Sequence, residues 1–255
     1  MSPSDEALPS ALREAVAATV SRMRTARREA LAASAAENRR WEYGGRTWYW
    51  PGGEELPYFF ELCEGEDAAL SALEERFGLS RLGVGTGRVV LTGAIVADAV
   101  GDREDDVVGD REDDAVDDRG GDDDRIVDAA AGDGSRAIKL ARYGPSAEMG
   151  DGRRQNRRER ELSAAIDGHP FLPVLNWDPD DDWVVMPRAR VPDADGPDTE
   201  RVLESVRSAL EPYADRVHFD EVKPENVGRW NGRVWLLDYG RPPGDRPPES
   251  GADRF

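Results

Sequence analysis

The sequence predicts an α+β protein in which helices pack against an antiparallel sheet, and three observations support this class. Near the N-terminus, apolar residues recur at spacings of three and four, which indicates an amphipathic helix. Short apolar runs joined at glycine-containing turns indicate antiparallel hairpins. Further helix-like segments separate these runs. With 255 residues, the chain suffices for one large domain or two small ones with a sizeable core.

Composition restricts the class of partner. The formal net charge is -19, and the only lysines among the 34 basic residues are Lys139 and Lys223. An acid excess with little lysine resembles the proteins of salt-loving organisms, although a GC-rich genome also favours arginine. We expect no binding to duplex nucleic acid, because strong negative charge opposes phosphate. No signal peptide and no apolar run of about 18 residues is evident, so the sequence predicts a cytoplasmic protein without membrane contact.

Cysteine and histidine give little sign of a metal or redox site. Cys63 is the only cysteine, so it cannot form an internal disulfide, and we expect a buried apolar thiol. His169 is expected at a helix end and His218 in a structural role. These scattered residues do not suggest a transition-metal site.

The N-terminal region, residues 1–78, is expected to begin with a helix over residues 4–37. Its apolar face comprises Leu12, Val16, Val20, Met23 and Ala26. This face could pack on the body of the protein, which we favour, or on a protein partner.

An aromatic hairpin is expected next, over Trp41–Gly53, with its turn at Gly44 and Gly45. Its aromatic residues could stack on single-stranded bases, but cross-strand packing is the more ordinary arrangement. A helix over Pro57–Phe77 is expected to end at Gly78.

A strongly acidic insertion, about residues 96–134, interrupts the following region. Between Asp98 and Asp133 it carries 16 acidic residues against 4 arginines, and the motif VGDREDD occurs twice. We expect a disordered loop, because so little apolar content cannot offset the entropy of ordering. Calcium binding is the alternative, but the acidic spacing matches no EF-hand loop.

Short strands and two helices make up the rest of the predicted fold. Before the insertion, residues 81–93 read as a strand, a glycine turn and a strand. After it we expect strands over 135–144, 173–177 and 183–186 and helices over 153–166 and 199–213. The tail, residues 241–255, is rich in Pro and Gly and is expected to be disordered.

The stretch from His218 to Gly240 gathers groups that could hold a cation. An Asn231-Gly232 pair between two apolar runs predicts a tight hairpin turn. That turn would bring Asn226 and Asp238 to the same end of the hairpin. An amide oxygen and a carboxylate there could share a hard cation such as Mg²⁺.

Four motifs in order resemble the protein-kinase-like superfamily over residues 79–240. They are LGVGTG at 82–87, AIKL at 137–140, KPEN at 223–226 and DYG at 238–240. The resemblance implies a kinase-like small lobe, with an antiparallel sheet and a helix, and a much reduced second lobe. Only 15 residues follow Gly240, so the usual platform for a peptide substrate is not expected.

The resemblance also implies a site for ATP and Mg²⁺. Lys139 would contact phosphate and be oriented by Glu159, which fits better than Glu161, while Met186 would lie near the adenine. The glycines expected near the phosphates are Gly83, Gly85 and Gly87. Asn226 and Asp238 would hold the metal.

The catalytic base is ambiguous between Asp220 and Glu221. The family places an aspartate five residues before the loop asparagine, a position occupied here by Glu221, whereas Asp220 lies six before Asn226. The expected function is a phosphotransferase on an unknown substrate, or a pseudokinase-type binding module without turnover. A third possibility, that the motifs are coincidental, predicts that Lys139 and Asp238 lie far apart.

Overall fold

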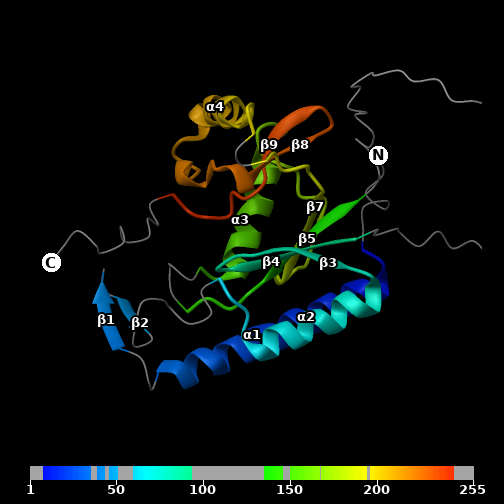
Figure 1. Cartoon of the computed structure of the whole chain (residues 1–255), viewed down its shortest axis with the longest axis vertical. Helices are drawn as coiled ribbons and strands as arrows, with labels where there is room; N and C mark the ends of the chain where they lie inside the picture. The colour runs from blue at the N-terminus through cyan, green and yellow to red at the C-terminus, as the bar shows by residue number, and fades with distance from the viewer. Residues whose placement is uncertain are drawn as a thin grey trace, which may run out of the picture.

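The computed structural model has an α+β architecture with helices on both sides of an antiparallel sheet (Figure 1). It describes residues 8–35, 39–43, 46–50, 60–93, 135–145, 150–166, 168–193 and 196–243. The acidic insertion predicted over 96–134 lies outside these ranges, as does the predicted tail beyond residue 243. Within the described ranges, no helix combines the length and the apolar character needed to cross a bilayer.

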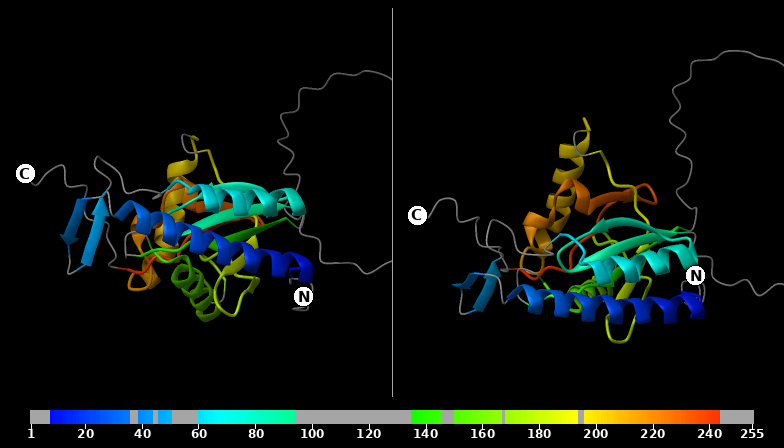
Figure 2. Two further views of the ribbon diagram at one scale, coloured as in Figure 1. Left: turned by 90° about the horizontal axis from the view of Figure 1, so that it is seen from below. Right: turned by 60° about the horizontal axis from the view of Figure 1, so that its bottom comes forward.

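Two N-terminal helices cover one face of the sheet. Helix α1 (Ser10–Ala35) lies alongside α2 (Glu64–Phe77) beneath the strands (Figure 2). The predicted apolar stripe of α1 is confirmed as an internal contact, because Leu12, Val16 and Val20 are almost wholly buried. That stripe is therefore not available to the protein partner considered from the sequence.

The region between these helices contains the predicted hairpin. Strands β1 (Arg39–Tyr43) and β2 (Arg46–Trp50) pair antiparallel, and their connecting glycines lie outside the described residues. Helix α2 begins at Glu64, later than predicted, where the Glu66 carboxylate accepts a hydrogen bond from the Cys63 amide. Cys63 is buried, as expected.

A five-stranded antiparallel sheet forms the centre of the molecule, in the order β3-β4-β5-β7-β6. Its strands are β3 (Ser80–Val84), β4 (Arg88–Gly93), β5 (Arg136–Ala141), β6 (Asn176–Trp177) and β7 (Trp183–Pro187). Gly93 at the end of β4 pairs with Arg136 at the start of β5. Strand β6 is shorter than predicted.

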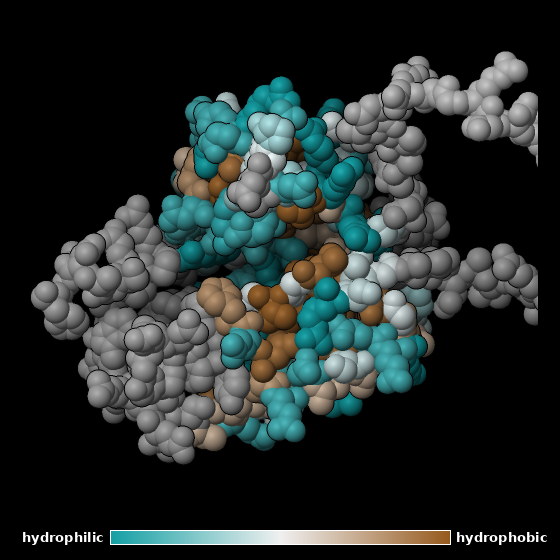
Figure 3. Space-filling model, viewed as in Figure 1, coloured by the Kyte–Doolittle hydropathy of each residue, from teal (hydrophilic) through white to brown (hydrophobic). Residues whose placement is uncertain are grey.

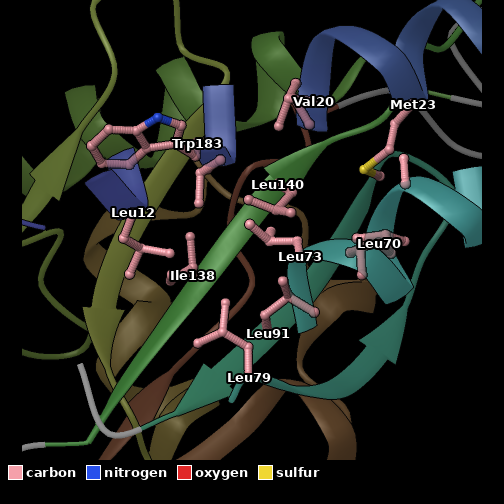
Figure 4. Close-up of a cluster of buried hydrophobic side chains, with 14 of the residues drawn as sticks. Leu12, Val20, Met23, Leu70, Leu73, Leu79, Leu91, Ile138, Leu140 and Trp183 are labelled. Atoms are coloured by element: carbon pink, nitrogen blue, oxygen red, sulfur yellow. The ribbon is translucent and has the colours of Figure 1, made fainter. Parts of the chain in front are cut away.

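Alternation along the strands gives the sheet two different faces. Leu91, Ile138 and Leu140 point toward α1 and α2 and pack there with Leu70 and Leu73 (Figure 4). This first hydrophobic cluster contains residues from the predicted N-terminal region, 1–78, and from the predicted kinase-like region, 79–240. On the opposite face, Lys139 pairs across the strands with Val90 and points away from the cluster.

A second hydrophobic cluster lies on the other side of the sheet. Its residues come from β7, from α3 (Gly152–Ala165), α4 (Thr199–Leu210), β8 (Val227–Trp230) and β9 (Arg233–Leu236), and from the segments that connect them. This part of the chain also forms 3₁₀ turns at Glu211–Tyr213, Phe219–Glu221 and Pro224–Asn226. The predicted hairpin turn is confirmed, because Asn231 and Gly232 both have positive φ, 49° and 72°. Val227 pairs with Leu236, so Asn226 and Asp238 follow at the open end of this hairpin.

Candidate functional site

A group of charged side chains lies between the two hydrophobic clusters. Arg88 and Lys139 come from the sheet, Glu159 from α3, and Asp238 from the segment after β9. Between the sheet half and the half that carries α4 and β8–β9, the molecular surface is hollowed (Figure 3). Hydrophilic residues predominate above this recess, and a hydrophobic patch with hydrophilic residues around it lies directly below.

Lys139 is anchored at the centre of the group. Its Nζ donates to Glu159 Oε1 and Oε2 at 2.7 and 3.0 Å, and also to the Leu237 carbonyl at 2.5 Å. Glu159 is fully buried, whereas Glu161 on the same helix is exposed. The structure thus brings together Lys139 and Glu159. Asp238 directly follows Leu237, whose carbonyl Lys139 contacts, so the AIKL and DYG motifs lie close together.

Helix α3 reaches this position because its first turn packs tightly against the sheet. Asp151 caps the helix by accepting a hydrogen bond from the Arg153 amide at 3.0 Å. At Gly152, a Cβ atom would lie 2.1 Å from the Gly87 carbonyl oxygen, so only glycine fits there. Two turns further on, Glu159 faces Lys139.

Arg88 is a member of the site that the sequence motifs did not identify. Its Nη2 lies 2.5 Å from Asp238 Oδ1 and its Nη1 2.7 Å from Glu159 Oε2, and its side chain is only 4% exposed. Arg88 is the first residue of β4, on the same sheet face as Lys139. Its role depends on strand register, which the sequence reveals only after the pairing of β4 with β5 is known.

The charges shift one another's protonation. Burial alone would raise the pKa of the Asp238 carboxyl, but the positive charges of Arg88 and Lys139 outweigh burial and hold it at about 2. Burial lowers the pKa of Lys139, although Glu159 opposes that effect. For Arg88, burial is outweighed by Asp238 and Glu159, so its pKa rises and it stays charged.

Asp238 should therefore contribute to acid sensitivity. Its folded-state pKa is below its ordinary value of 3.8, so its contribution to stability is present above about pH 4 and is lost as the pH falls toward 2. We expect Asp238→Asn to reduce the loss of unfolding free energy between pH 5 and about pH 2. Urea titrations at constant potassium chloride measure this slope. Exposed Asp215→Asn is the control, and equal slopes in both variants would contradict the assignment.

The structure distinguishes the two candidate bases by their contacts. Glu221 accepts a hydrogen bond from Asn226 Nδ2 at 2.9 Å and pairs with Arg241 at 3.0 Å, and its side chain is 14% exposed. Asp220 is 61% exposed and lies 3.5 Å from His218 Nδ1. Glu221, rather than Asp220, is thus the carboxylate next to Asn226, although it is already hydrogen-bonded.

Two arginines donate hydrogen bonds to backbone carbonyls of the glycine turn. Arg142 Nη1 donates to the Gly85 carbonyl at 2.6 Å and Arg27 Nη1 to the Thr86 carbonyl at 2.7 Å. The Gly85 amide donates to the Arg88 carbonyl at 2.8 Å, so it is not free to bind a phosphate as the resemblance implied. Gly87 packs against α3, while Gly83 lies at a register shift in β3 and is exposed.

Met186, expected near the adenine, and Asn226, expected at the metal, both have little exposed surface. Met186 is 1% exposed on β7 and packs in the second hydrophobic cluster. Asn226 is 9% exposed and donates through Nδ2 to Glu221, so its Oδ1 is the atom that would face a cation. Oxygen donors of Asn226 and Asp238 suit Mg²⁺ chemically. Among the described residues, no three His, Cys, Asp or Glu side chains form a metal cluster.

Comparisons with known proteins give no family assignment. No protein-family model matches the chain, and a search of curated proteins found none with significant similarity.

Proposed function

We propose that this chain binds Mg-ATP in a kinase-like site between its two hydrophobic clusters and is a phosphotransferase on an unknown substrate. One observation carries the proposal. Separate motifs assign Lys139, Glu159 and Asp238 to one nucleotide site. Glu159 pairs with both Lys139 and Arg88, and Arg88 pairs in turn with Asp238, so the three residues belong to one connected group. An arbitrary set of chance motifs would have no reason to converge in this way.

The residue types suit phosphoryl transfer, in which positioning and charge neutralisation account for most of the catalysis. Lys139 would bind phosphate oxygens, with Glu159 fixing its direction. Asn226 and Asp238 would hold Mg²⁺, which when bound neutralises charge on the phosphates. The Met186 side chain is packed in the second hydrophobic cluster, so it has no exposed surface to offer the adenine.

Binding without turnover is the second candidate, and the contacts of Glu221 favour it. A general base must reach the proton that it abstracts and must be free to accept it. Here Glu221 is engaged by Asn226 and Arg241, while Asp220 is turned toward His218. A pseudokinase-type module would keep the nucleotide site and lack this step.

Nucleotide binding tests both candidates. We expect Lys139→Met to weaken Mg-ATP binding by about 10- to 100-fold, because a charge-assisted hydrogen bond contributes about 1.5–3 kcal/mol. Calorimetric titration in high potassium chloride measures the affinity, since salt screens the repulsion within an acidic chain. Arg136→Met, on the same strand but the opposite face, is the control. Absence of binding in the wild type, or unchanged binding in Lys139→Met, would refute the proposal.

Turnover then separates the candidates. A phosphotransferase shows release or transfer of the terminal phosphate that Glu221→Gln abolishes. A binding module shows wild-type nucleotide affinity with no phosphate release above that of a Lys139→Met sample.

A further inference from the structure

We propose that Arg88 is an internal cation that closes the Asp238 metal position, so that a divalent cation binds there only together with a nucleotide. This inference rests on the proposed function, because it specifies how the same site is regulated. It follows from the contacts, charge and position of Arg88.

The Arg88 guanidinium bridges the two carboxylates of the site. It lies 2.5 Å from Asp238 Oδ1 and 2.7 Å from Glu159 Oε2, both short enough to exclude an ion from the space between. A divalent cation that approached Asp238 Oδ1 would therefore meet a fixed positive charge at hydrogen-bond distance.

The charge balance gives the same result. Arg88 and Lys139 supply two positive charges, and Glu159 and Asp238 supply two negative ones, within one connected group. Arg88, Lys139 and Glu159 are at most 7% exposed, whereas the Asp238 side chain is 40% exposed. Adding Mg²⁺ alone would leave this largely buried group with an excess of two positive charges, which is unfavourable where the dielectric constant is low. A polyphosphate brings compensating negative charge, so nucleotide and metal should enter together.

Arg88 also has the chemistry needed to exchange partners. A guanidinium carries five N–H donors, and planar carboxylates and phosphates are its usual acceptors. The contact of Nη1 with Glu159 lacks hydrogen-bond alignment, although the atom is buried. Because Arg88 directly follows the glycine turn, its donors could turn from Asp238 to a phosphate oxygen and release the carboxylate to the metal.

Binding of Mn²⁺ as a probe for Mg²⁺ tests this switch without any measurement of catalysis. The chain has 53 acidic residues, so weak binding elsewhere is expected and the readout is the component that Asp238→Asn removes. In electron paramagnetic resonance titrations without nucleotide, we expect no such component in the wild type. In Arg88→Gln it should appear, with at least about tenfold higher affinity than any wild-type signal. With ATP present, the component should appear in the wild type as well.

Several outcomes would overturn the inference. One is a wild type that binds Mn²⁺ at Asp238 without nucleotide; another is an Arg88→Gln variant that gains no such component. If Arg88→Gln does not fold, as judged by circular dichroism, Arg88→Met replaces it, because it also removes both the charge and the bridge between the carboxylates, and the same gain is expected. Failure of ATP to bind any variant would refute the proposed function, whereas the nucleotide-free comparison would still decide whether Arg88 excludes the cation.

Discussion

Replacement of Glu159 with alanine is expected to lower the free energy of unfolding by about 3–5 kcal/mol, which is typical when one partner of a buried ion pair is removed. Glu159 is fully buried, and both Lys139 and Arg88 pair with it. Its loss would leave two buried cations facing Asp238 alone. The Tyr239 amide would also lose its acceptor, Glu159 Oε1, at 3.1 Å.

Glu161→Ala is the matched control for this prediction. Glu161 lies on the same helix two residues later and is exposed, so its replacement should change stability by about 0.5 kcal/mol or less. Urea unfolding at constant potassium chloride, followed by circular dichroism, compares the two variants. Equal stabilities for Glu159→Ala and Glu161→Ala would show that the charged group does not stabilise the fold.

Arg142→Met is also expected to lower the free energy of unfolding by about 3–5 kcal/mol, because it breaks a second buried ion pair. Arg142 and Glu66 are fully buried, with two contacts at 2.8 and 2.9 Å. Arg142 also donates to the carbonyls of Glu61 and Gly85. The variant would leave the Glu66 carboxylate buried with its cation removed and would release one support of the glycine turn.

A double variant separates the loss of a pair from the burial of a lone charge. Replacing both partners, as in Arg142→Met with Glu66→Leu, should recover part of the lost stability, because no unpaired charge then remains. Arg207→Ala, which removes an exposed ion pair with Glu200, is the control and should cost at most about 1 kcal/mol. Thermal melts of all variants give the comparison, and a double variant less stable than Arg142→Met would contradict this account.

The elements that the sequence predicted well are those specified by local patterns. The apolar stripe of α1, the stop of α2 at Gly78 and the Asn231-Gly232 turn each depend on residues within a few positions of one another. The proximity of Asn226 and Asp238 also followed, because a two-residue turn fixes the register of its hairpin.

The contacts that the sequence did not predict depend on pairing between distant segments. Arg88 meets Asp238 across 150 residues, and Arg142 meets Glu66 across 76. No periodicity along the chain encodes such pairs. Because nearly all basic residues are arginines, the sequence also does not distinguish a buried arginine from an exposed one. The choice between Asp220 and Glu221 needed the conformation of the 3₁₀ turn at Phe219–Glu221, which sets which carboxylate faces Asn226.

The pairing of Gly93 with Arg136 has a consequence for how this gene could change over time. The two residues that flank the stretch between β4 and β5 are held side by side as cross-strand partners. For a flexible connection, doubling its length costs only about 0.6 kcal/mol in closure entropy. Residues added between the paired ends therefore need not separate the two strands, and the twofold VGDREDD is the sequence that duplication of a short motif would leave.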